Sequence, residues 1–163
     1  MGICRAVSWR WTASVGVAVV IAFAVIGISP RTLGTTLTPV IGADPTGVVM
    51  VGAWAETPIG EFLHARAGLS VSVVRSARLL LAGGGITGSM RWGALEPMLG
   101  LGVGAALAPA GFASGAVLEG DLGARLWVVD WVAVLTQMRY IIRFSEGGVS
   151  AGPLFEAGLA FTF

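Results

Sequence analysis

Residues 118–128 read LEGDLGARLWV, and all three charged side chains of this stretch fall on odd-numbered positions. The even-numbered positions hold only Leu, Gly, Ala and Val. Because successive residues of a β-strand point to opposite sides, one face of this segment is apolar and the other carries Glu119, Asp121 and Arg125. The pattern is typical of a strand that turns one face to lipid and the other to an enclosed polar interior.

Three further stretches, 63–73, 98–107 and 132–144, alternate in the same way. The polar faces of the first and the last carry His64, Arg66, Gln137, Arg139 and Arg143. The middle stretch places glycines at every second position opposite Leu, Val and Ala, as expected in a narrow interior where other side chains need room. The predicted strands are 35–43, 47–56, 62–74, 78–91, 97–108, 117–129, 132–144 and 153–163. Gly83, Gly84 and Gly85 leave an alternative in which a tight loop splits the fourth strand.

A sheet in hydrocarbon must close on itself, because no water is present to satisfy an open edge. Bacterial barrels of this kind have an even number of strands, starting at eight. The chain has 163 residues, and the part after position 34 divides into eight units of about 16 residues, enough for a tilted strand and its connection. We therefore predict an all-β fold, a closed antiparallel up-and-down transmembrane β-barrel of eight strands over residues 35–163.

The composition agrees with a membrane protein. Hydrophobic residues make up 55% of the chain and charged residues only 12%, against about 25% in soluble domains. The formal net charge is +1 without any basic block, which excludes nucleic acid as an expected partner. The single cysteine, Cys4, precedes the predicted barrel, so the barrel has neither a disulfide nor a cysteine metal site.

Membrane-spanning helices are the competing fold. After residue 35 the one uncharged block long enough for such a helix is 97–118, and it contains Pro109 and glycines spaced by two rather than four. Elsewhere a lipid-exposed helix would bury charged side chains at about 2.5 to 3.5 kcal/mol each. The strand pattern removes this penalty by sending the charges inward.

The first 34 residues are predicted to be a signal peptide with a helical apolar core. Arg5 and Arg10 precede an uncharged run over 11–30, the layout of a secretory signal. The alternative is a retained helix, which would make the chain an inner-membrane helical protein anchored by residues 11–30.

The chain ends in EAGLAFTF, residues 156–163, which alternates strictly and finishes on an aromatic residue. This end resembles the C-terminal signal of bacterial outer-membrane barrels, matched by Glu156, Gly158, Phe161 and Phe163. The resemblance implies that the barrel assembly machinery recognises the last strand by pairing with it.

The barrel region as a whole resembles the small eight-stranded barrels of the OmpA/OmpX type. The segment from Gly123 through Arg125, Asp130-Trp131 and Arg139-Tyr140 is similar to the last hairpin of those proteins. The resemblance implies a multi-pass protein of the Gram-negative outer membrane. It covers architecture and implies no activity, and no soluble peptidoglycan-binding domain follows the barrel in this sequence.

Aromatic residues cluster near the connections at 57–60, 93–96 and 129–131, which are short enough to be periplasmic turns. We expect a periplasmic aromatic girdle formed by Trp54, Trp92, Trp127 and Trp131, joined by Phe161 and Phe163. Two positions strain this expectation, because Trp127 falls on the interior face by parity and Trp54 shares a face with Glu56.

The interior of an eight-stranded barrel is filled by side chains or holds one small ligand. We expect a paired charge network inside, formed by Arg66, Arg91, Glu119, Asp121, Arg125, Arg139, Arg143 and Glu156. A hairpin around Asp130 puts Asp121 opposite Arg139, with Glu156 approaching Arg139 or Arg143 from the other side. The predicted function is a closed structural or adhesive barrel without an open pore, acting through surface loops at 109–115 and 145–152. A narrow gated channel is the alternative.

Catalysis is not expected. A lipid-modifying barrel enzyme would need a nucleophile and a base within hydrogen-bond reach, and Ser70 and Ser72 lie too far along the strand from His64. Ser89 or a serine on another strand stays open. No cofactor or metal is expected, and the predicted partners of the monomeric barrel are outer-membrane lipid and the assembly machinery.

Overall fold

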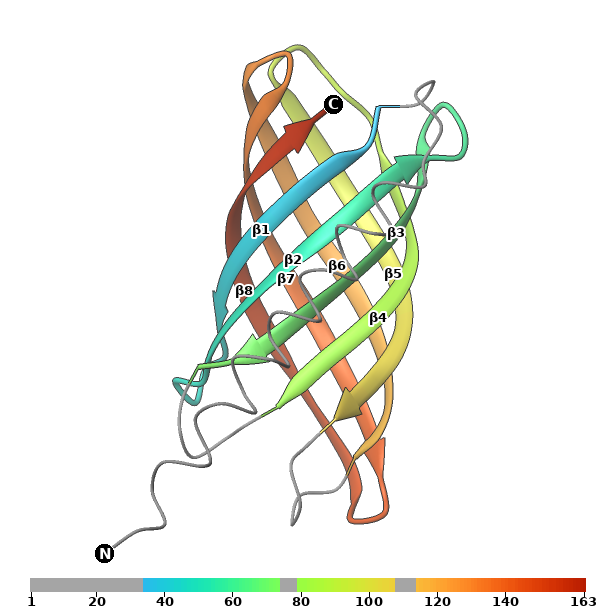
Figure 1. Cartoon of the computed structure of the whole chain (residues 1–163), viewed down its shortest axis with the longest axis vertical. Coiled ribbons are helices and arrows are strands. Elements are labelled where there is room, and N and C mark those ends of the chain that lie inside the picture. Colours follow the sequence, from blue (N-terminus) through green and yellow to red (C-terminus); the bar gives the residue numbers. More distant parts are fainter. Residues whose placement is uncertain (1–33, 74–78, 108–113) are drawn as a thin grey trace, which may run out of the picture. The chain divides into compact units, whose positions relative to one another are not determined.

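The computed structural model describes residues 34–73, 79–107 and 114–163, and these form eight antiparallel strands (Figure 1). The strands are β1 (Thr36–Ala43), β2 (Val49–Pro58), β3 (Leu63–Ser72), β4 (Leu80–Ser89), β5 (Leu95–Leu107), β6 (Gly115–Val129), β7 (Val132–Ser145) and β8 (Gly148–Thr162). Each strand pairs with its neighbours in sequence, and β1 also pairs with β8, so the sheet closes. The predicted closed eight-stranded barrel is confirmed.

The alternation read from the sequence determines which side chains point outward. On β6, Leu118, Leu122 and Leu126 are 44%, 60% and 53% exposed, whereas the interleaved Glu119, Asp121 and Arg125 are 5% exposed or less. The other strands show the same division, with large apolar side chains outside and polar ones inside. The protein is thus apolar where a soluble domain is polar, as a barrel in hydrocarbon requires.

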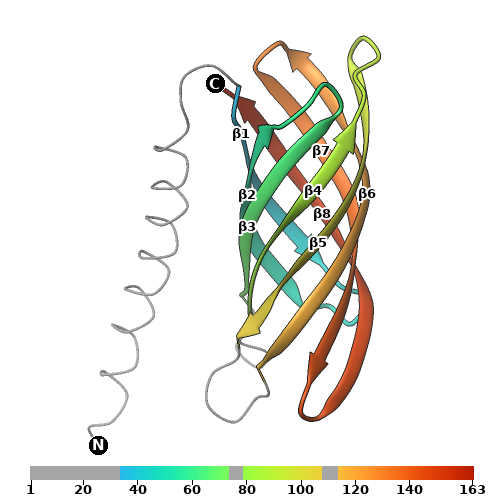
Figure 2. The same cartoon turned by 90° about the vertical axis from the view of Figure 1, so that its right-hand side faces the viewer.

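The first strand begins and the last strand finishes at the same end of the barrel axis. The start of β1 pairs with the end of β8, and the C terminus lies beside the start of β1 (Figure 1). Three connections, 59–62, 90–94 and 130–131, belong to this C-terminal end. The connections at 44–48 and 146–147 belong to the opposite end, which we call the distal end (Figure 2).

The structure corrects the last connection. Residues 145–152, expected to form a surface loop, instead contain the end of β7, a two-residue turn and the start of β8. Ser145 pairs with Gly148, whose φ of 119° suits the turn because glycine has no Cβ to clash there. The eighth strand therefore begins at 148 rather than 153.

The strand ladders decide between the two predictions for the fourth strand and show how β1 accommodates a proline. Gly83, Gly84 and Gly85 pair continuously with β3 and β5, so the alternative loop in the fourth strand is wrong. Pro39 lies inside β1, where the ladder with β8 has no pair at residues 38 and 39. A proline lacks the N–H that such a pair needs.

The predictions for the signal peptide and for one surface loop concern residues that the structure does not describe. The signal peptide and its retained-helix alternative fall on residues 1–33, and most of the 109–115 loop falls on 108–113, outside the described residues. No helix within the described ranges is long and apolar enough to cross a membrane. The helical alternative for the region after residue 35 is wrong, because the described part of that region is built of strands.

Candidate functional site: the interior of the barrel

The middle of the interior holds two arginines that share one carboxylate. Arg66, on β3, donates from Nη2 to Glu119 Oε1 at 3.2 Å and also to Asp121 Oδ2. Arg139, on β7, donates from Nη1 to the other oxygen of Glu119 at 3.5 Å. These side chains are at most 4% exposed, so the pairs lie in a medium that screens charge weakly.

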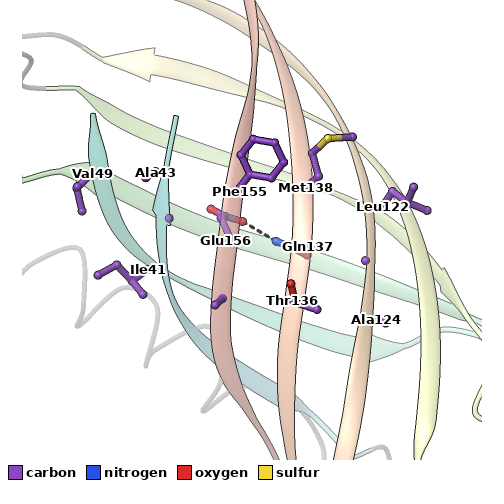
Figure 3. A pocket seen from close by; sticks show the side chains of 13 residues that line it. Ile41, Ala43, Val49, Leu122, Ala124, Thr136, Gln137, Met138, Phe155 and Glu156 are labelled. Atoms are coloured by element: carbon purple, nitrogen blue, oxygen red, sulfur yellow. Dashed lines mark hydrogen bonds between the residues drawn. The ribbon is translucent and has the colours of Figure 1, made fainter. Parts of the chain in front are cut away.

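Glu156 extends the network on the side of β8. It accepts a hydrogen bond from Arg139 Nη2 at 2.8 Å and another from Gln137 Nε2 at 2.5 Å (Figure 3). Arg139 Nη2 also donates to Ser70 Oγ at 3.3 Å. Five charged groups from four strands are thereby connected, three carboxylates and two guanidinium groups, so the carboxylates outnumber the cations by one.

Trp54 contacts both arginines through its ring. The guanidinium carbons of Arg66 and Arg139 lie 4.4 and 4.7 Å from the centre of its ring, within the range of cation–π attraction. The residue is 3% exposed. The expected place of Trp54 in an aromatic girdle is therefore wrong, since its even position on β2 directs it inward.

Glycines make space for the carboxylates. A Cβ added at Gly100 would lie 2.8 Å from Asp121 Oδ2, and one at Gly102 would lie 2.7 Å from Glu119 Oε1. Both distances are shorter than contacts that real Cβ atoms make. Gly100 and Gly102 thus leave room for the charge network, in agreement with the narrow interior that the sequence pattern indicated.

A second charge cluster lies nearer the C-terminal end. Arg125 pairs with Glu56 and, through Nη1, with Glu96 at 3.3 Å. Glu96 also accepts hydrogen bonds from Ser89 Oγ at 2.6 Å and from Trp127 Nε1 at 2.7 Å. Glu56 and Glu96 were not among the predicted network residues, although Glu56 shares the interior face of β2 with Trp54. Trp127 points inward rather than into a girdle, as its parity indicated.

Arg91 and Arg143 do not belong to the predicted network. Arg91 lies beyond the end of β4, where its half-exposed side chain donates to Asp130 Oδ1 at 3.3 Å and lies 4.8 Å from the Trp127 ring. Arg143 lies at the distal end, and among the described residues it makes no ion pair. Both residues were misassigned for the same reason, because the parity of a residue predicts which face of the sheet it lies on but not how far along the barrel axis it lies.

An apolar layer closes the interior on the distal side of these charges. It consists of buried side chains near the distal ends of five strands: Met50, Leu81, Ala106, Val117 and Leu154. Val48, Leu79 and Ile141 pack against it. The interior therefore changes from charged to apolar along its axis.

The remaining predicted residues lie on the barrel surface or in the last strand. Trp92, Trp131 and Phe163 are 64%, 60% and 78% exposed at the C-terminal end, while Phe161 is half-buried. A Cβ at Gly158 would lie 2.9 Å from Val40 Cγ1, so glycine permits the close packing of β8 on β1. The role of this strand in assembly stays a prediction.

The geometry around His64 does not form a catalytic triad. His64 Nε2 lies 3.3 Å from Ser89 Oγ, but the serine hydroxyl donates to Glu96 at 2.6 Å. The proton of the Ser89 hydroxyl is therefore directed to the carboxylate and not to the imidazole. Within the described residues, no group of three or more His, Cys, Asp and Glu side chains could hold a metal ion.

A groove on the outer wall crosses β1, β6, β7 and β8 (Figure 3). It has a volume of about 740 Å³ and lies where the small side chains of Ala124, Thr136 and Ala157 are flanked by Leu122 and Phe155. These side chains belong to the outward faces of their strands. In a bilayer the groove faces acyl chains.

No protein-family model matches the sequence, and no curated protein matches it either. Solved structures match most of the chain. The N-terminal β-barrel domain of Pseudomonas aeruginosa OprF matches with a TM-score of 0.65 and 8% identity, covering 80% of this chain and 97% of that one. Neisserial surface protein A (NspA) matches with a TM-score of 0.61 and 15% identity, covering 80% and 96%. A de novo designed transmembrane β-barrel matches with a TM-score of 0.63 and 15% identity, covering 83% and 100%. The chain thus has the fold of the eight-stranded outer-membrane barrels, as the OmpA/OmpX resemblance implied.

Proposed function

We propose that this chain is a multi-pass protein of the bacterial outer membrane whose barrel is closed to ions and has a structural or adhesive role. One observation carries the proposal: paired charges and an apolar layer follow one another along the interior. An ion that crossed would have to break the buried pairs of Arg66 and Arg139 and then pass Met50, Leu81 and Leu154. Both steps are unfavourable, because each removes a charge from its counter-charge or from water.

Conductance of the purified barrel in a planar bilayer tests this proposal. We expect no steady current from the natural sequence. Replacing the apolar layer in the variant Met50→Ser/Leu81→Ser should raise the frequency of brief openings, since the layer then admits water. Substitution of the exposed Trp92 by Ser provides the matched control and should leave the baseline flat. A steady large-pore current through the unaltered protein would refute the closed barrel and favour a channel.

We also propose that the barrel has no catalytic activity. Support comes from Ser89, whose hydroxyl is directed to Glu96 rather than to His64. The variant His64→Ala should therefore leave the lipid composition of the host membrane unchanged. A change in acyl-chain composition with this variant would contradict the proposal.

A further inference from the structure

A cavity of about 440 Å³ lies at the distal end of the barrel, on the outer side of the apolar layer. Its size falls within the range of small-molecule pockets. Its apolar lining includes Met50, Leu81 and Leu154 from the layer, together with Val48 and Leu79 beside it. Gly152 also lines it, and a Cβ added there would meet no atom within 4 Å.

Among the described residues that line this cavity, Arg143 is the cation. Arg143 is half-buried and, among the described residues, makes no ion pair; its Nε is buried without a hydrogen-bond partner, as it is in the other interior arginines. Its cross-strand neighbours are Val117 on β6 and Ser150 on β8, neither of which is acidic. By contrast, Arg66, Arg125 and Arg139 all pair with buried carboxylates.

The acidic residue of the cavity lining is already engaged. Asp44 accepts hydrogen bonds at its Oδ1 from the backbone N–H groups of Thr46 and Val48, both at 2.9 Å, and from Thr46 Oγ1 at 2.7 Å. Slight burial raises the pKa of Asp44, but these hydrogen bonds prevail and lower it. The carboxylate stabilises its own turn, so among the described residues Arg143 has no counter-ion.

We propose that this cavity binds a fatty acid. The acyl chain would lie on the surface formed by Met50, Leu81 and Leu154, and the carboxylate would pair with Arg143. A guanidinium group binds a carboxylate through two parallel hydrogen bonds, and the hydroxyl of Ser150, paired with Arg143 in register, offers another donor. The volume admits one acyl chain beside its headgroup more readily than the several chains of a membrane lipid.

Methionine methyl groups provide a readout that separates the cavity from the surrounding lipid. Met50 is buried beneath the cavity, whereas Met138 lies on the outer wall and is 38% exposed. We would titrate decanoate into the folded barrel in lipid nanodiscs and record the carbon-13 methyl shifts of both residues. Site binding should shift Met50 saturably, whereas partitioning into lipid should affect Met138 linearly.

Two variants test the two parts of the proposal. Gly152→Leu fills the cavity and should abolish the saturable shift of Met50. Arg143→Gln should weaken decanoate binding about tenfold, which is a loss of about 1.4 kcal/mol, and leave the weaker binding of decanol unchanged, because only the carboxylate loses a charged partner. Arg91→Gln, at the other end of the barrel, is the matched control and should bind like the natural sequence.

The outcomes decide the proposal independently of conductance. A response at Met138 without saturation at Met50 overturns it, as does unchanged binding in Gly152→Leu or Arg143→Gln. Tighter binding of decyl phosphate than of decanoate would overturn the assignment to a carboxylate. If Gly152→Leu fails to fold, as judged by circular dichroism, the Arg143→Gln titration is decisive alone.

Discussion

Replacing Arg139 by Leu tests how strongly the paired charges stabilise the barrel. The side chain is 1% exposed and donates hydrogen bonds to Glu156, Ser70 and Glu119. Removing one partner of a buried pair leaves the other charge uncompensated and lowers the free energy of unfolding by about 3–5 kcal/mol. We expect a loss near 3 kcal/mol, because Glu156 keeps its hydrogen bond from Gln137 and Glu119 keeps Arg66.

The assay is equilibrium unfolding of the refolded barrel in lipid vesicles, followed by tryptophan fluorescence. In the double variant Arg139→Leu/Glu156→Leu neither charge is left alone, so the loss should be smaller than the sum of the two single losses. Arg91→Leu is the matched control. Its pair with Asp130 is exposed, and its removal should not measurably change the stability. A loss below about 1 kcal/mol for Arg139→Leu, or strict additivity of the double variant, would refute the reasoning.

Three further predictions concern packing, pH and assembly. Gly102→Val should lower the free energy of unfolding by about 1–3 kcal/mol in the same assay, because its Cβ would collide with the Glu119 carboxylate; a neutral effect would contradict the tight packing. The pKa of Asp44 is lowered in the folded protein, so the ionised carboxylate stabilises the distal turn at pH values above the ordinary pKa of 3.8. This stabilisation should disappear as the pH falls through the folded-state pKa. Amide exchange at Val48 measures it, and Asp44→Asn should remove the pH dependence. Deletion of Phe163 should reduce the heat-modifiable, folded barrel in cells but not refolding in vitro; equal loss in both would indicate a structural role instead.

The sequence predicted the faces of the strands well and the partners inside the barrel only in part. A hairpin around Asp130 put Asp121 opposite Arg139, and the two residues are indeed paired in register. The expected approach of Glu156 to Arg139 is confirmed by their ion pair at 2.8 Å. Asp121, however, binds Arg66, and Arg139 binds Glu119 as well. Arg66 on β3 reaches Asp121 on β6 across the narrow barrel, so the partner of an interior side chain need not lie on a neighbouring strand.

Position along the barrel axis was the other quantity that local sequence did not determine. Trp54 is four residues from the end of β2 and was expected near the membrane interface, yet its ring lies in the interior within cation–π distance of Arg66 and Arg139. The parity argument and the distance-to-turn argument disagreed for this residue, and parity was correct. Side-chain direction follows from the two-residue repeat, whereas depth depends on strand tilt and register, which only the closed sheet defines.

The division of the interior into layers separates two kinds of arginine. The first kind lies on the C-terminal side of the apolar layer and comprises Arg66, Arg125 and Arg139. Buried carboxylates pair with these guanidinium groups and take the place of hydrating water. Arg143 also lies on the interior face of its strand, but near the distal side of that layer, beyond the reach of those carboxylates. Arg143 takes no part in the buried ion pairs and lies next to an apolar surface at the distal end. We therefore assign it to ligand binding rather than to stability. Arg143→Gln should therefore leave the free energy of unfolding nearly unchanged, whereas Arg139→Leu lowers it. Similar losses in both variants would show that both arginines stabilise the fold and would contradict this assignment.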